Sequence, residues 1–379
     1  MTPYDVIVLG LGGVGAAASY HAARRGRRVL ALERFGVAHD RGSSHGETRI
    51  IRHAYAHAGY LPLLDRSVAS WEELERRAAR PLVRRTGLVF VADAKSRGDM
   101  DRARAAASRH GVVMEALDAQ ELAARFPRFR IPSGGAGLYE PNAGYVLVEE
   151  SIRAHCALAR EAGAELRFEE PVSSWRGEGK GVVVDTGKGR YYGGALVIAG
   201  GAWSAEVLAD LGLPLVVERI PQAWYAAGAD WSAEAGAPCF IFDLESGYFF
   251  GVPATAAGRL KVAGRNKRVV VPDPSQLTRG LMAGERAAIG NFIETHLPGV
   301  SSTPLAESVC MCTMTPNEHF IVDAHPACPQ VVFAAGLSGH GYKFAPVLGE
   351  ALAEMAIDGA TRLPIDFLRR PSQSEILLQ

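Results

Sequence analysis

Residues 4–33 read YDVIVLGLGGVGAAASYHAARRGRRVLALE, and this stretch decides how the rest of the chain is interpreted. Its first six residues predict a buried strand, and the Ala-rich segment after the glycines predicts a helix. Gly10, Gly12 and Gly15 have the spacing that makes a tight turn, admits a pyrophosphate close to the backbone, and packs helix on strand. Glu33 ends a second apolar run, where a carboxylate can accept hydrogen bonds from a ribose diol. The stretch therefore predicts a dinucleotide-binding βαβ unit.

The composition limits the classes of partner. The chain has 379 residues, with 41 Lys plus Arg against 41 Asp plus Glu. This length is enough for two domains that share one ligand. The balanced charge gives no support for a nucleic-acid or anionic-membrane partner, and no apolar stretch is long enough to span a membrane. The five scattered cysteines and a strand that begins at Tyr4 favour a reducing cytoplasm, without a disulfide framework or a signal peptide.

Strand and glycine patterns further along predict how the chain is divided. The apolar run at 195–199 ends in two glycines, which suggests a return to the first sheet, whereas 216–305 alternates strands and turns like an antiparallel sheet. A strand at 331–335 leads through a glycine loop into a helix over 344–357, and residues 96–126 are predicted to be mostly helical. We predict a mixed α/β (α+β) fold, with a Rossmann-type domain and a smaller substrate domain. The first is assigned to 1–84, 141–215 and 306–379, and the second to 85–140 and 216–305.

Three motifs carry a family resemblance. The segment Gly42–Tyr55, GSSHGETRIIRHAY, resembles the signature of the monomeric sarcosine oxidase family, which includes N-methyltryptophan oxidase and pipecolate oxidase. Residues 310–313 (CMCT) with 318–323 (EHFIVD), and residues 336–344 (GLSGHGYKF), are similar to further motifs of that family, in the same order. The resemblance implies a monomeric flavoenzyme that binds FAD and oxidises a secondary amino acid. The products would be an imine, which water hydrolyses, and hydrogen peroxide.

The resemblance also implies that FAD is attached covalently, through a cysteine thioether to the flavin 8α-methyl group. By motif position the cysteine is Cys310. A buried, inert thiol is the alternative, because most cysteines in reduced proteins are of that kind. Cys312 is a rival nucleophile, since two residues apart on a strand share one face.

The family pattern assigns further roles to charged residues. Arg52 and Lys343 match the pair that grips the substrate carboxylate, and Lys261 resembles the lysine that activates oxygen beside the flavin. A fixed cation there would stabilise developing superoxide. His45 and Arg49 match residues near the flavin ring. The positions predicted to bind FAD are Gly10, Gly12, Gly13, Val14, Gly15, Glu33, Arg34, Gly42, Ser43, Thr48, Arg49, Val172, Gly201, Trp203, Cys310, Gly339, His340, Gly341 and Lys343.

Three pocket positions depart from the family pattern. Cys312 stands where a tyrosine is common, Phe249 belongs to a Phe-Phe pair where tyrosines are common, and Arg265 stands where sarcosine oxidases have histidine. Fewer phenols make a roomier pocket, and a guanidinium suits bidentate binding of a carboxylate. A larger or dicarboxylic secondary amino acid is therefore an alternative to sarcosine. The competing interpretation is that Arg265 points into solvent with Lys267 and Arg268.

Other functions remain open on the sequence. A flavin dehydrogenase with a different electron acceptor is one, although Lys261 argues against it. A NAD-dependent dehydrogenase would share the first βαβ unit but would not explain Cys310, and a non-catalytic flavin-binding protein would fit the altered pocket positions. His53 and His57 are one helical turn apart, but no third ligand is evident, so we predict no metal site.

Overall fold

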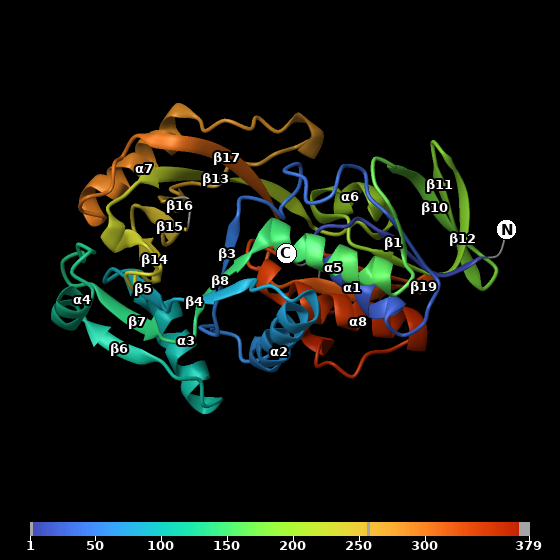
Figure 1. Cartoon of the computed structure of the whole chain (residues 1–379), viewed down its shortest axis with the longest axis horizontal. Helices are drawn as coiled ribbons and strands as arrows, with labels where there is room; N and C mark the ends of the chain where they lie inside the picture. The colour runs from blue at the N-terminus through green and yellow to red at the C-terminus, as the bar shows by residue number, and fades with distance from the viewer. Residues whose placement is uncertain (1–2, 256–257, 371–379) are drawn as a thin grey trace.

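A computed structural model describes residues 3–255 and 258–370 and shows two large sheets side by side (Figure 1). The first sheet has eight strands, with β1 (Tyr4–Leu9) between β2 (Val29–Leu32) and β12 (Gly189–Ile198), parallel to both. The pairing of β12 with β1 confirms the predicted return of the chain to this sheet. Its other strands are β9 (Glu165–Arg167), β10 (Val172–Glu178), β11 (Gly181–Thr186), β18 (Ile321–His325) and β19 (Cys328–Ala335).

Helices α1 (Gly13–Ala23), α5 (Val148–Glu161) and α8 (Ala345–Asp358) pack together beside the first sheet. Every residue of α1 is buried, which explains its run of small alanines. A Cβ on Gly349 of α8 would lie only 2.5 Å from the Cβ of Ala17, so α1 and α8 touch closely. This packing fixes the start of α1 at the carboxyl end of β1, where the glycine turn lies.

The second sheet is built mainly from antiparallel pairs, as predicted for residues 216–305, and it also has eight strands. Their order is β17 (Pro304–Met314), β13 (Val216–Ala226), β16 (Arg259–Arg265), β15 (Gly247–Val252), β14 (Cys239–Leu244), β5 (Leu88–Ala92), β7 (Ala136–Glu140) and β6 (Glu115–Asp118). Helices α3 (Arg97–Arg109), α4 (Ala119–Arg125) and α7 (Ala283–His296) lie around it.

A small three-stranded sheet joins the two halves. It consists of β3 (Thr48–Ile51), β8 (Gly144–Leu147) and β4 (Val83–Arg85). Figure 1 shows it between the two large sheets, with α2 (Tyr60–Ala78) next to it and the short α6 (Ser204–Val207) above the first sheet. The family signature therefore lies at the junction, where β3 carries Arg49 and its neighbours.

One sequence expectation needs correction. The boundary placed at 305/306 cuts through β17, which pairs with β13 along its length, so the second sheet extends to Met314. Long-range pairing overrides the local pattern there. The segment 96–126 is mostly helical, as predicted, and β6 lies between α3 and α4 and pairs with β7.

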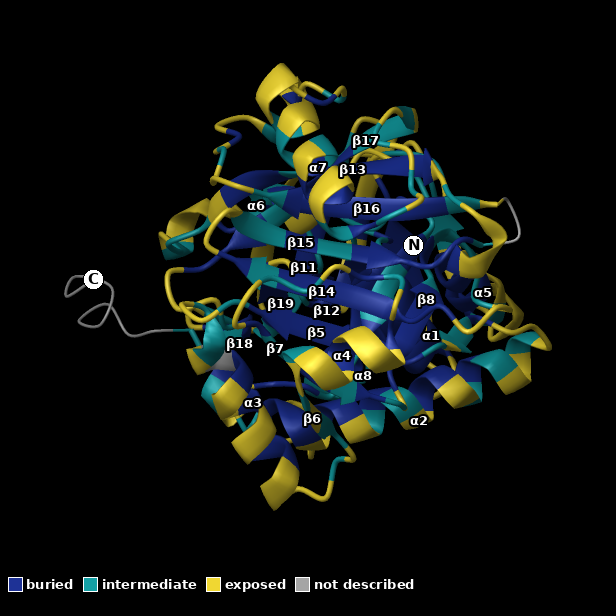
Figure 2. Cartoon of the chain, turned by 90° about the vertical axis from the view of Figure 1, so that its left-hand side faces the viewer, coloured by how far each residue is buried: buried dark blue, intermediate teal, exposed yellow. Residues whose placement is uncertain are grey.

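Burial follows the two-sheet plan. In Figure 2 the strands are mostly buried, and exposed residues gather on outer helices such as α3 and α4. None of the helices over 3–255 and 258–370 combines the length and the apolar character needed to cross a bilayer.

Two buried histidines predict acid sensitivity. Burial lowers the pKa of His155 on α5 from 6.5 to about 4, and it also lowers the pKa of His21 on α1. The unfolded chain takes up these protons first. The free energy of unfolding is therefore highest above pH 6.5 and decreases as the pH falls toward 4. We expect His155 alone to cost about 2 kcal/mol of unfolding free energy at pH 5.

Urea unfolding at pH 7.5 and pH 5 measures this loss. His155→Gln should show a smaller difference between the two pH values than wild type. His110→Gln, which alters an exposed histidine at the end of α3, should leave it unchanged. An equal pH dependence in all three proteins would contradict the assignment.

Candidate active site

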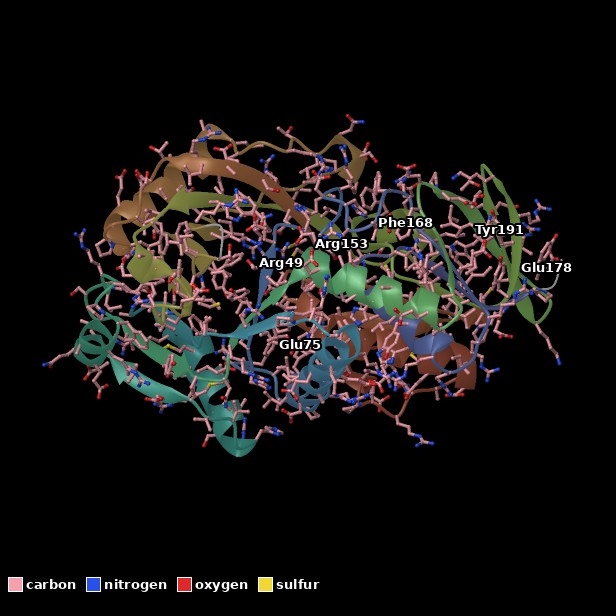
Figure 3. The ribbon with its side chains drawn as sticks, in the orientation of Figure 1. Arg49, Glu75, Arg153, Phe168, Glu178 and Tyr191 are labelled. Carbon is pink, nitrogen blue, oxygen red and sulfur yellow. The ribbon has the colours of Figure 1, made fainter. Side chains whose placement is uncertain are left out.

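One cavity of about 760 Å³ runs between the two large sheets. At one end it is lined by the glycine turn before α1, and in the middle by β17 and the loop before α8. At the other end it reaches the second sheet at Phe90, Ile241 and Phe250. Figure 3 places Arg49 in the middle of the molecule, near the start of α5.

The glycine turn has the geometry that a bound pyrophosphate requires. Gly10 has a φ of +88°, and a Cβ there would lie 2.5 Å from the carbonyl oxygen of Ala199. A Cβ on Gly15 would lie 1.8 Å from the carbonyl oxygen of Gly10, so only glycine lets α1 pack on β1. The start of α1, where Gly12, Gly13 and Val14 line the cavity, is a helix N-terminus, which favours an anion.

Glu33 stands at the end of β2, as predicted. Its carboxylate accepts hydrogen bonds from the backbone N–H groups of Leu11, at 2.7 Å, and Phe35, at 3.0 Å. These bonds hold the carboxylate at the cavity wall. Of the positions predicted to bind the cofactor, Gly15 and Thr48 lie behind the surface of the same cavity. The others line it: Gly10, Gly12, Gly13, Val14, Glu33, Arg34, Gly42, Ser43, Arg49, Val172, Gly201, Trp203, Cys310, Gly339, His340, Gly341 and Lys343.

Cys310 lies on β17 against Arg49. The Arg49 guanidinium donates to Cys310 Sγ at 2.8 Å and to the carbonyl oxygen of Ser43 at 2.9 Å. Burial by itself would raise the pKa of the Cys310 thiol, but Arg49, His45 and Lys261 outweigh it and lower the pKa from 9.0 to about 6. These three groups therefore favour the thiolate of Cys310, the form in which cysteine is a nucleophile.

Cys312 lines the same cavity but has the opposite character. Burial raises the pKa of its thiol to about 12, and the neighbouring Cys310 adds to this effect. The two cysteines, which the sequence left as rivals, thus differ in reactivity because only Cys310 contacts Arg49.

Lys261 lies behind the cavity wall rather than on it. Its side chain is 4% exposed, and Nζ donates to the carbonyl oxygens of Gly46, at 2.6 Å, and Thr48, at 3.0 Å. Burial, followed by the charge of Arg49, lowers the pKa of Lys261 from 10.5 to about 7. This burial does not fit a lysine on the solvent-facing side of a strand.

Arg52 and Lys343 meet at one tyrosine. The guanidinium carbon of Arg52 is 4.8 Å from the centroid of the Tyr55 ring, and Lys343 Nζ is 5.3 Å from it. Lys343 is buried and donates to the Tyr55 hydroxyl at 2.9 Å and to the carbonyl oxygen of His340 at 2.8 Å. The pair thus concentrates two cations at the cavity, which suits a carboxylate.

Arg265 lines the cavity, but its guanidinium is already paired. It donates to the buried carboxylate of Glu218, which also lies 3.4 Å from Arg268. Arg268 in turn binds Glu318 at 2.6 Å. Arg265 thus lines the cavity with a partly exposed side chain, and the guanidinium expected to recognise a second carboxylate has an acid of this chain as its partner.

Phe249 does not line the cavity, which corrects its assignment to the substrate site. It stacks on Phe292 of α7 with ring centroids 4.4 Å apart. Because neighbouring residues of a strand face opposite sides, Tyr248 and Phe250 line the cavity instead. Together with Ile50 they give this end of the cavity a largely apolar, aromatic wall, beside the charged residues Asp243 and Arg265.

The two histidines considered for a metal have other partners. His53 Nδ1 lies 3.2 Å from a Glu140 carboxylate oxygen, and the His57 ring stacks on Phe367. Over the part of the chain that the structure describes, no three His, Cys, Asp or Glu side chains are grouped as metal ligands.

Comparison with known proteins decides the family. The family described as FAD dependent oxidoreductase matches residues 5–355 of this chain. The chain belongs to this family. It is therefore an FAD-dependent oxidoreductase, which confirms the resemblance and the cofactor predicted from the sequence.

Relatives named as oxidases match this chain over nearly their whole length. The chain is 40% identical to monomeric sarcosine oxidase of Streptomyces avermitilis over 373 residues, covering 96% of this chain and 97% of that protein. It is 35% identical to N-methyl-L-tryptophan oxidase of Salmonella arizonae, covering 94% and 95%. The solved structure of NikD, an unusual amino acid oxidase essential for nikkomycin biosynthesis, has a TM-score of 0.88 at 26% identity and covers 98% of each chain.

The residues present fit FAD. The glycine turn and Glu33 suit its diphosphate and ribose, and Cys310 lies further along the same cavity. The side chain of Gln222 also lines the cavity, is 2% exposed, and has an amide Nε2 without a hydrogen-bond partner. A buried donor of this kind requires an acceptor, which the heteroatoms of a flavin can provide.

Sequence reasoning missed Tyr55, Gln222 and Glu218. Tyr55 is the last residue of the family signature, and its position three residues after Arg52 was a usable signal. Gln222 and Glu218 lie on β13 without a local motif, so only the fold reveals them.

Proposed function

We propose that the protein oxidises a secondary amino acid at the carbon–nitrogen bond and passes the electrons to molecular oxygen. The observation that carries this proposal is the placement of Arg52 and Lys343 at the Tyr55 ring, in the same cavity as Cys310. Two cations there hold the substrate carboxylate and so orient the bonds next to its nitrogen.

The reaction removes two electrons and two protons from the amino acid. FAD, when bound, accepts the electrons, and oxygen finally takes them to form hydrogen peroxide. The remaining imine is hydrolysed by water. Arg52 and Lys343 orient the carboxylate throughout, while Arg49 and Lys261 supply fixed positive charge near Cys310.

The proposal includes a thioether between Cys310 and the flavin 8α-methyl carbon. Its formation removes one hydrogen from the thiol and one from the methyl group, and oxygen takes up the two electrons. The contact with Arg49 supports Cys310 in this role, because it stabilises the thiolate. We also propose that the enzyme acts as a monomer in the cytoplasm.

The apolar end of the cavity favours a substrate larger than sarcosine. Phe90, Ile241 and Phe250 have no charged group to offer, and the Arg265 guanidinium is held by Glu218. We therefore expect a bulky or cyclic secondary amino acid rather than a dicarboxylic one. Peroxide release from sarcosine, pipecolate, N-methylphenylalanine and N-methylglutamate, compared as kcat/KM, tests this order, and a preference for N-methylglutamate would contradict it.

Lys343 predicts how carboxylate affinity depends on pH. Burial and the charge of Arg52 lower the pKa of Lys343 well below 10.5, so its ammonium loses a proton at lower pH than an exposed lysine would. A simple carboxylate such as butyrate should therefore bind about tenfold more weakly once the pH has risen through this pKa. Flavin absorbance titrations from pH 6 to 10 measure the effect. Lys343→Met should bind butyrate weakly at every pH, and a pH dependence that survives in this variant would contradict the assignment.

A further inference from the structure

The two carbonyl groups that hold Lys261 belong to one strained turn. Gly46 has a φ of +92° and Glu47 a φ of +67°, and the Thr48 N–H closes the turn on the Gly46 carbonyl at 2.8 Å. A positive φ at a residue other than glycine is unfavourable and persists only where neighbouring groups impose it. The position of the Lys261 ammonium therefore depends on what holds this turn.

The carboxylate of Glu149, in the first turn of α5, holds it. Oε1 accepts from the Gly46 N–H at 2.7 Å, and both carboxylate oxygens lie within 3.2 Å of the Glu47 N–H. The adjacent Val148 N–H donates to the Glu47 carbonyl at 2.8 Å. Charge-assisted hydrogen bonds of this kind are about twice as strong as neutral ones, so the start of α5 clamps the backbone that holds Lys261.

A second carboxylate acts on the other side of the turn. The Glu47 side chain accepts from Trp224 Nε1 at 2.9 Å and from the Arg259 guanidinium at 2.5 Å. Trp224 lies opposite Lys261 in the pairing of β13 with β16, and Lys261 Nζ is 5.8 Å from its ring centroid. These contacts anchor the Glu47 side chain to β13 and β16, whereas Glu149 binds the N–H groups of Gly46 and Glu47 in the turn itself.

We propose that Glu149 is a positioning residue for the oxygen step: through the Gly46–Thr48 turn it holds the Lys261 ammonium in place. This inference rests on the proposed oxidase function. It assigns no contact between Glu149 and substrate or flavin.

The charge of Glu149 also acts on Lys261 directly. The ionisable groups that face Lys261 are Arg49, which lowers its pKa, and Cys310, Glu149 and Glu47, which raise it. Glu149→Gln keeps an oxygen that can accept from the turn but removes the charge. We therefore expect its reoxidation rate to fall off at lower pH than that of wild type, whereas Glu149→Ala loses the position as well.

The test is a double-mutant cycle on flavin reoxidation. Enzyme reduced with dithionite in the absence of oxygen is mixed with aerated buffer, for wild type, Glu149→Ala, Lys261→Met and the double variant. We expect Glu149→Ala to slow reoxidation about tenfold, as for loss of a hydrogen bond to a charged group, and to add no slowing in the Lys261→Met background. Glu150→Gln is the matched control. The Glu150 carboxylate is next to Glu149 in sequence but binds Arg80 and Arg153 on the surface.

Hydrogen–deuterium exchange provides a readout independent of turnover. The amides of Gly46 and Glu47 should exchange faster in Glu149→Ala and unchanged in Glu150→Gln. Equal slowing of reoxidation by Glu149→Ala in both backgrounds, or unchanged exchange of the two amides, would overturn the inference. If Lys261→Met itself reoxidises normally, the oxygen role of the lysine fails instead, so the two failures are distinguishable. Should Glu149→Ala not fold, Glu149→Gln serves instead, because its neutral amide accepts more weakly than the carboxylate: wild-type exchange of the two amides together with a wild-type pH profile would overturn the inference.

Discussion

Lys261→Met should slow the reoxidation of the reduced enzyme by oxygen about 10²–10³-fold, the usual cost of removing one preorganised donor from developing negative charge. Lys261 is held by two carbonyl groups beside Arg49 and Cys310, so the position of its side-chain nitrogen is fixed before oxygen arrives. Reduction by the substrate should change less than threefold, because Arg52 and Lys343 hold the carboxylate on other elements. Stopped-flow absorbance of the flavin separates the two half-reactions.

Lys267→Met is the control for this prediction. Lys267 is exposed and follows the same strand, so its loss changes the net charge equally without touching the cavity. Its reoxidation should match that of wild type. Equal slowing of both half-reactions in Lys261→Met would show that the lysine has a general structural role and none specific to oxygen.

Cys310→Ser should abolish covalent attachment of FAD completely. In wild type the Arg49 contact lowers the pKa of the Cys310 thiol to about 6, whereas a serine hydroxyl stays protonated and cannot replace it as a nucleophile. After denaturation and precipitation we expect flavin fluorescence to stay with wild-type protein and to appear in the supernatant of Cys310→Ser.

Cys312→Ser is the matched control, because this second thiol lines the same cavity with a raised pKa. Its flavin should stay with the precipitated protein. Release of flavin from Cys312→Ser together with retention in Cys310→Ser would reverse the assignment. Release from wild type would show that the flavin is bound without a covalent link.

The features that could be predicted from the sequence are those that a local motif defines. Gly10, Gly15 and Glu33 have roles set by neighbours within one βαβ unit, and the structure places all three as expected. The signature at 42–55 likewise identified the segment of Arg49 and Arg52. These positions need no knowledge of which strands pair across the chain.

The features that were missed depend on long-range pairing. In the pair Phe249-Phe250 either ring could face the cavity, and only the packing of α7 on the opposite side assigns Phe249 to the core. Glu218 and Arg265 are 47 residues apart in sequence and meet because β13 and β16 pair. The local sequence specifies neither contact.

The central claim is that this enzyme oxidises a secondary amino acid held by its carboxylate and returns the electrons to oxygen. The most direct measurement is flavin absorbance when the enzyme is mixed without oxygen with N-methylphenylalanine, its methyl ester and the primary amine phenylalanine, followed by air. We predict bleaching by the N-methyl amino acid alone and full recovery in air with one peroxide per flavin. Bleaching by the ester as readily as by the acid, or no recovery in air, would contradict the account.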